Sequence, residues 1–97
     1  MYDIRYSKPA EQYLKKIKDK SLLTAFKQAI DKLKLDPYIG TLKVGDLQGI
    51  YGYDIKYAGT NYELAYRIYE ENGKLIVVIL AGTRENFYKE LKRLVKK

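Results

Sequence analysis

The longest apolar run of this chain, residues 75–81, constrains its fold more than any other segment. The run is far shorter than the about 20 apolar residues that a helix needs to cross a membrane. It is rich in valine and isoleucine, and it has no polar position that would face solvent. We therefore expect residues 75–80 to form an interior strand that is covered on both faces.

Three other stretches alternate between apolar and polar positions, as strands of a half-buried sheet do. They comprise residues 2–6, 51–57 and 62–69. A turn at residues 59–61 would join the last two, and Asn72-Gly73 predicts a two-residue hairpin turn before the apolar run. Because strands joined by hairpins run antiparallel, we expect this part of the sheet to be antiparallel.

Apolar residues at helical spacing predict three helices. The first follows Ser7, a good N-cap residue, and the second begins after a break at residues 19–21 and ends before Pro37. The third is expected to start at Thr83 as its N-cap. Their apolar stripes are Ala10, Tyr13, Leu14 and Ile17; Leu22, Leu23, Phe26, Ala29, Ile30 and Leu33; and Phe87, Leu91, Leu94 and Val95.

The expected order of elements is β-α-α-β-β-β-α, which belongs to the α+β class. A helical hairpin would pack on a small, mostly antiparallel sheet, and a C-terminal helix would follow. Since a chain of 97 residues supports one hydrophobic core, we expect residues 1–97 to form a single domain.

The composition excludes several kinds of chemistry. Without cysteine or histidine, the chain cannot form disulfides, the usual zinc sites or a serine–histidine triad, and its glycines match no nucleotide-binding loop. We therefore expect no metal and no cofactor. The first residues form no apolar signal region, so we expect a cytoplasmic protein without a membrane segment.

The charge of the chain points to a class of partner. Lysine and arginine total 19 against 12 acidic residues, a net charge of +7. Such a charge attracts polyanions, including nucleic acid, through counterion release. Solubility alone is the alternative explanation.

Strand alternation also predicts a charged patch on the sheet. Asp54 would share a face of its strand with Lys56, and Glu63 would share a face of the next strand with Arg67. If these two faces coincide, the patch would lie next to Arg84 and Tyr88, which are one helical turn apart at the start of the last helix. The four candidate catalytic residues are Lys56, Arg67, Arg84 and Tyr88.

Cations beside a phenol suit RNA cleavage, in which a ribose 2′-hydroxyl attacks the adjacent phosphate. Guanidinium groups would stabilise the charge that grows on the phosphoryl oxygens. The proton acceptor would be a lysine whose pKa neighbouring cations lower, or Glu63. The alternative is structural: Lys56 and Arg67 would form exposed pairs with acidic neighbours, worth about a few tenths of a kcal/mol, and Tyr88 would fill the core.

Three strings of the sequence are similar to motifs of one known group of proteins. They are GDLQG at residues 45–49, the tyrosine-rich residues 62–69, and GTRENFY at residues 82–88. In this order and spacing, over nearly the whole chain, they resemble the RelE/ParE superfamily of bacterial type II toxins. The resemblance implies a toxin that a cognate antitoxin wraps and keeps silent.

RelE-like members of that superfamily cut messenger RNA in the ribosomal A site without a metal, and the resemblance implies the same activity. By this resemblance Lys56 matches a second-strand lysine, Arg84 the arginine after the fourth strand, and Tyr88 the C-terminal tyrosine.

The chain departs from the RelE-like pattern at two positions. Glu63 stands where an arginine is usual, and Asp54 replaces another second-strand lysine. Arg67 could substitute, although it lies about 13 Å farther along the strand. The preferred hypothesis is a ribosome-dependent mRNA endoribonuclease. The lost cations leave two alternatives open: a ParE-like inhibitor that binds DNA gyrase, or a degenerate member without nuclease activity.

Overall fold

The computed structural model describes residues 1–96, and its centre is a five-stranded sheet with the order β1-β5-β4-β3-β2. β1 (Asp3–Tyr6) runs parallel to β5 (Leu75–Thr83), and all other neighbours are antiparallel. The remaining strands are β2 (Thr41–Leu42), β3 (Tyr51–Tyr57) and β4 (Thr60–Tyr69). The predicted α+β class is confirmed. β2 is an addition to the predicted order, because a strand of two residues shows no alternation.

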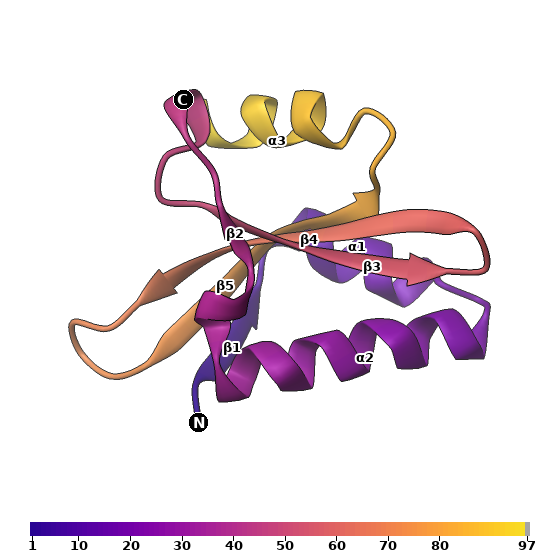
Figure 1. The fold of residues 1–97 in the computed structure, drawn as a ribbon, viewed down its shortest axis with the longest axis horizontal. Coiled ribbons are helices and arrows are strands. Elements are labelled where there is room, and N and C mark those ends of the chain that lie inside the picture. Colours follow the sequence, from indigo (N-terminus) through magenta and orange to yellow (C-terminus); the bar gives the residue numbers. More distant parts are fainter. Residues whose placement is uncertain (97) are drawn as a thin grey trace.

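Helices cover both faces of this sheet. α1 (Lys8–Lys16) and α2 (Lys20–Leu35) form a hairpin on one face, and α3 (Phe87–Val95) lies across the other (Figure 1). Two short 3-10 turns, η1 (Pro37–Ile39) and η2 (Gly45–Leu47), flank β2. Among residues 1–96, no helix is long and apolar enough to cross a membrane.

Side-chain caps fix the starts of both helices of the helical hairpin. The Ser7 hydroxyl accepts a hydrogen bond from the backbone N–H of Ala10 at 3.2 Å, which caps α1. The Asp19 carboxylate accepts from the N–H groups of Ser21 and Leu22 at 2.9 and 3.2 Å, which caps α2. The predicted start of α1 is thus confirmed, whereas α2 starts at Lys20, inside the break that was predicted at residues 19–21.

The sheet separates two apolar cores, where a single hydrophobic core was expected. The larger lies under α1 and α2, and the smaller lies between α3 and the opposite face. Because β5 gives Val78 to the first and Leu80 to the second, its apolar run is buried from both sides, as expected. The first core includes Phe26, Leu33, Leu64, Tyr66 and Ile76, and the second Leu47, Ile50, Ala65, Phe87 and Leu91.

The register of β3 and β4 places the charged strand residues on the α3 face. Asp54 lies directly opposite Glu63, and Lys56 lies opposite Asn61. The predicted coincidence of the two charged faces is therefore confirmed.

Both predicted hairpin turns need correction. The turn between β3 and β4 is formed by Ala58 and Gly59, which both have positive φ. The predicted turn at residues 59–61 therefore began one residue late and ended two residues late, inside β4. The β4–β5 connection spans residues 70–74, because Tyr69 pairs with Leu75. A two-residue turn at Asn72-Gly73 was wrong: it requires positive φ at both positions, and only Gly73 has it.

The predicted N-cap of the last helix was also wrong. Thr83 is still in β5, where it pairs with Tyr62, so the strand continues past the predicted helix start. α3 starts after Asn86, which has left-handed φ and gives no side-chain cap. The N–H of Phe87 instead donates to the Arg84 carbonyl at 3.1 Å. This short connection turns the chain so that Phe87 enters the smaller core.

Candidate functional site

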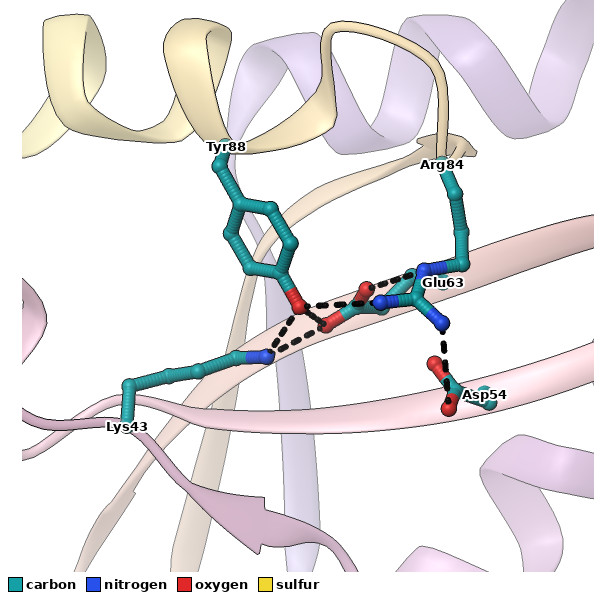
Figure 2. Close-up of polar contacts among 5 residues, drawn as sticks. All are labelled: Lys43, Asp54, Glu63, Arg84 and Tyr88. Atoms are coloured by element: carbon teal, nitrogen blue, oxygen red, sulfur yellow. Dashed lines mark hydrogen bonds and ion pairs between the residues drawn. The ribbon is translucent and has the colours of Figure 1, made fainter.

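Five charged or polar side chains meet on the α3 face of the sheet (Figure 2). They come from segments that are far apart in the sequence: the chain after β2, strands β3 and β4, the connection after β5, and the first turn of α3. We call them the charged cluster; its members are Lys43, Asp54, Glu63, Arg84 and Tyr88.

Glu63 is the centre of the charged cluster. Its side chain is 1% exposed, and its Oε2 lies 3.0 Å from the Lys43 ammonium. Its Oε1 faces the Arg84 Nε at 3.6 Å, and this oxygen has no hydrogen-bond partner. A buried carboxylate needs opposite charge nearby to offset its lost hydration, and the two cations supply that charge.

Gly52 creates the space in which this ion pair lies. A Cβ at this buried strand position would be 2.2 Å from Glu63 Oε2 and 2.8 Å from the Lys43 nitrogen. Any larger residue would therefore push the lysine and the carboxylate away from β3. A glycine inside a strand often marks such a close approach.

Lys43 is held tightly. Its ammonium donates a hydrogen bond to the Tyr88 hydroxyl at 2.6 Å and lies 4.4 Å from the centre of that ring. Burial acts to lower the pKa of Lys43, but the bonds to Tyr88 and Glu63 outweigh it and raise that pKa. The residue thus stays charged and does not accept a proton.

Arg84 is held loosely by comparison. Its Nη1 lies 3.8 Å from Asp54 Oδ2, and its Nη2 donates to the Tyr88 hydroxyl at 3.5 Å. Asp54, and then Tyr88 and Glu63, raise the pKa of the guanidinium. Its side chain is 45% exposed, although its backbone N–H is fixed by a 3.0 Å bond to the Asn61 carbonyl.

Tyr88 completes the charged cluster from above the sheet. Its hydroxyl accepts from Lys43 and Arg84 and donates to Glu63 Oε2 at 3.5 Å. The neighbouring Phe87 is buried in the smaller core, and the two rings meet edge to face at 5.9 Å. The core contact of Phe87 therefore fixes the direction in which Tyr88 points.

The structure brings together two of the four predicted site residues, Arg84 and Tyr88. Lys56 is exposed opposite Asn61, and Arg67 places its guanidinium beside Gly49. Within residues 1–96, no ion pair or side-chain hydrogen bond joins either of these two cations to the charged cluster. The acidic neighbours bind Lys43 and Arg84 instead.

Sequence patterns alone missed Lys43. It follows the two-residue strand β2 in an irregular segment, where no periodicity assigns its direction. The available signal was Gly52, a glycine within an alternating strand on the same face as Glu63. Such a glycine indicates that a side chain from another segment crosses the strand there.

The charged cluster is electrically balanced: two cations, Lys43 and Arg84, face two carboxylates, Asp54 and Glu63. A phosphate that binds either cation therefore competes with a carboxylate for it. In the described part of the chain, no group of three acidic side chains is arranged to hold a metal ion.

Comparisons with known proteins agree with this fold. A profile of the ParE-like toxins of type II bacterial toxin–antitoxin systems matches residues 4–92. A chain of the toxin–antitoxin complex RelBE2 from Mycobacterium tuberculosis is 26% identical, with a TM-score of 0.66 over 86% of this chain and 98% of that one. No curated protein sequence matches significantly.

A second solved structure supports the fold alone. It is a mutant of the Escherichia coli toxin RelE in the free state, in which two arginines are replaced by alanine. It is 18% identical, with a TM-score of 0.71. The match covers 97% of this chain and 98% of that one. With the profile spanning nearly all of the sheet and helices, the chain belongs to the ParE-like toxin family of type II bacterial toxin–antitoxin systems, within the RelE/ParE superfamily.

Proposed function

We propose that this toxin is a metal-independent, ribosome-dependent mRNA endoribonuclease that acts in the cytoplasm, and that the charged cluster is its active site. The observation that carries the proposal is the set around Glu63: a buried carboxylate with one unbonded oxygen, a half-exposed arginine and a phenol beside a fixed lysine. A carboxylate, two cations and a phenol supply every group that cleavage by a 2′-hydroxyl needs.

In the proposed reaction, the ribose 2′-oxygen bonds to the adjacent phosphorus while its proton passes to Glu63 Oε1. Arg84 binds the phosphoryl oxygens and stabilises the negative charge that grows on them. The bond from phosphorus to the 5′-oxygen breaks, which leaves a 2′,3′-cyclic phosphate and a 5′-hydroxyl end.

Tyr88 is the proposed proton donor to the leaving 5′-oxygen. The Lys43 ammonium, 2.6 Å from the phenol oxygen, stabilises the charge that remains when the proton has left. The proton on Glu63 Oε1 is then released to water and Tyr88 takes a proton from water, because the 3.5 Å contact of the phenol is to the other carboxylate oxygen, Oε2. The site is then ready for another cycle.

Lys56 and Arg67 have a different proposed role. They lie on the same face as Glu63, on opposite sides of it along the strands, and outside the charged cluster. We assign them to the phosphates that flank the cleaved bond. Such contacts strengthen binding without taking part in the bond change.

The test is to induce the toxin in translating cells and to map the ends of ribosome-bound transcripts. New ends should appear within coding regions, and Arg84→Ala and Tyr88→Phe should remove them. Lys16→Ala, an exposed cation on α1, should leave them in place. Growth arrest with unchanged transcripts would reject the nuclease.

The proposed partner is a cognate antitoxin, since one similar solved structure is a toxin–antitoxin complex. A surface of net charge +7 favours an acidic partner segment that folds on binding. The two proteins expressed together should purify as one complex, and growth arrest should occur only with the toxin alone. A toxin that recovers no partner from its native operon would argue against this proposal.

A second candidate function is inhibition of DNA gyrase by protein binding. The balanced charge of the cluster favours it, because a phosphate has to compete with a carboxylate for each cation. Trapped gyrase cleavage complexes and induction of the DNA-damage response would support this function. A degenerate toxin would give neither signature and no growth arrest.

A further inference from the structure

Glu63 lies between two cations that differ in how firmly they are held. Lys43 is 15% exposed, and its contacts to Tyr88 and Glu63 measure 2.6 and 3.0 Å. Arg84 is 45% exposed, and its contacts to Tyr88, Glu63 and Asp54 measure 3.5, 3.6 and 3.8 Å. Lys43 is thus held by short, mostly buried contacts, whereas Arg84 lies on the solvent side of Glu63 and makes only long contacts.

The oxygen that Arg84 faces is the unsatisfied one. Glu63 Oε1 is buried and accepts no hydrogen bond, although Arg84 Nε is 3.6 Å away. A buried acceptor without a hydrogen bond is unfavourable in free energy, so a donor that reaches Oε1 with better geometry than Arg84 lowers that free energy. A hydroxyl can reach Oε1 only if the guanidinium moves outward.

Asp54 holds the guanidinium from the outside. Its side chain is 65% exposed at the solvent end of the cluster, and it contacts Arg84 alone among the cluster residues. Figure 2 shows the guanidinium between the two carboxylates, with Asp54 below it. An exposed ion pair of this length is weak and is easily exchanged for another anion.

We propose that Asp54 is a latch: a positioning residue that keeps Arg84 across Glu63 until a phosphate takes the guanidinium. A phosphate offers oxygens that match the planar fork of arginine, which a single contact of 3.8 Å does not. Arg84 then follows the phosphate outward and uncovers Glu63 Oε1. The consequence for RNA cleavage rests on the proposed function, but the exchange of anions does not.

The variant that tests the latch is Asp54→Asn, which keeps the size of the side chain and removes its charge. Without the competing carboxylate, Arg84 is more available, so inorganic phosphate should bind about threefold to fivefold more tightly, as expected for loss of an exposed ion pair. Asp54→Glu restores the charge and should return the affinity towards that of the wild type. Asp31→Asn, on the exposed side of α2, removes the same charge far from the site and is the matched control.

Phosphate binding can be followed through the ¹⁵N side-chain resonance of Arg84 in an NMR titration with inorganic phosphate. The latch predicts a lower phosphate dissociation constant for Asp54→Asn alone, and the resonance should move as the guanidinium changes partner. Equal affinities for Asp54→Asn, Asp31→Asn and the wild type would overturn it. So would a titration in which the Arg84 resonance does not move.

RNA cleavage separates the latch from the proposed function. With a short RNA on the ribosome, Asp54→Asn should lower KM and so raise kcat/KM, whereas a purely structural role would lower kcat. If no variant cleaves RNA but the phosphate affinities differ as expected, the latch stands and the nuclease fails. If the wild type cleaves RNA and Asp54→Asn has the wild-type KM and phosphate affinity, the nuclease stands and the latch fails.

Discussion

The two faces of the sheet bury different kinds of side chain. Under α1 and α2 the contacts are apolar and form the larger core. On the other face, α3 has 9 residues against 16 in α2, and it leaves the turn end of the β3–β4 hairpin uncovered (Figure 1). The charged cluster lies where this apolar cover stops. The first face thus contributes most of the apolar burial that stabilises the fold. The second face has a smaller apolar core and also buries the charged side chains of the candidate site.

The largest stability effect should come from the helical face. Phe26 is fully buried and meets the rings of Tyr13 and Tyr62 edge to face at 6.1 and 5.7 Å. We expect Phe26→Ala to lower the free energy of unfolding by about 3–5 kcal/mol, measured by urea denaturation. Leu35→Ala, at a position 70% exposed, is the control and should cost little. A loss under about 1 kcal/mol for Phe26→Ala would contradict the assignment of the main core.

The largest activity effect should come from the α3 face. Removing one donor that stabilises the developing charge usually costs about 100-fold to 1,000-fold in rate, so we expect this loss of cleavage for Arg84→Ala. Because Arg84 is 45% exposed, the melting temperature should fall far less than in Phe26→Ala. Arg93→Ala, which removes an exposed arginine of α3, should keep its activity. Equal loss in both arginine variants would mean that charge alone matters.

A substitution at Gly52 should lower both the stability and the cleavage activity. Gly52→Ala places a methyl group 2.2 Å from the Glu63 carboxylate, and we expect it to cost about 1–3 kcal/mol of stability together with most of the cleavage. Gly82→Ala is the control, since its new Cβ would meet other atoms at the ordinary distance of 3.9 Å. Denaturation and cleavage assays on both variants separate the outcomes. A Gly52→Ala protein with wild-type activity would show that the Lys43–Glu63 pair is dispensable.

The smallest effect concerns acid stability. The phenols of Tyr2 and Tyr38 donate hydrogen bonds to Glu70, and these bonds hold the pKa of the Glu70 carboxyl below its ordinary value of 4.5. The lowered pKa adds stability at pH values above 4.5, and this contribution is lost as the pH falls through the folded-state pKa. Glu70→Gln should flatten the fall in melting temperature between pH 5 and pH 3, a range around that ordinary value.

Glu71→Gln is the matched control for the acid-stability prediction. It removes the same charge from the next residue, and both phenols donate their hydrogen bonds to Glu70 instead. Its melting temperature should follow that of the wild type as the pH falls. Identical pH profiles for Glu70→Gln and Glu71→Gln would show that the two phenols do not stabilise the charged form.

The sequence patterns predicted the elements that are long and have a regular arrangement of apolar residues. The helices and the strands β3 and β4 bury one face over many residues, so their periodicity is strong, and the continuous apolar run of β5 indicates a strand covered on both faces. The start of α3 depends on one left-handed residue, Asn86, and on the tertiary contact of Phe87, neither of which leaves a periodic signal. Strand parity placed Arg67 on the correct face, but its distance along β4 keeps it outside the charged cluster.

The candidate site could be predicted only in part. Arg84 and Tyr88 lie close in the sequence, at the i and i+4 positions from which their side chains can meet. Lys43 comes from an irregular segment that only the three-dimensional fold brings to the site. Glu63, which interrupts the expected pattern of cations, is the centre of the charged cluster because β4 carries it into a space that Gly52 leaves open.

The central claim is that the charged cluster cleaves RNA by attack of the 2′-hydroxyl. The most direct measurement is the chemistry of the ends produced when the purified toxin acts on mRNA bound to ribosomes. The proposed mechanism predicts 2′,3′-cyclic phosphate and 5′-hydroxyl ends with the wild type, and about 100-fold to 1,000-fold slower formation of these ends with Arg84→Ala. Ends that carry a 5′-phosphate, or cleavage at the wild-type rate in Arg84→Ala, would contradict it.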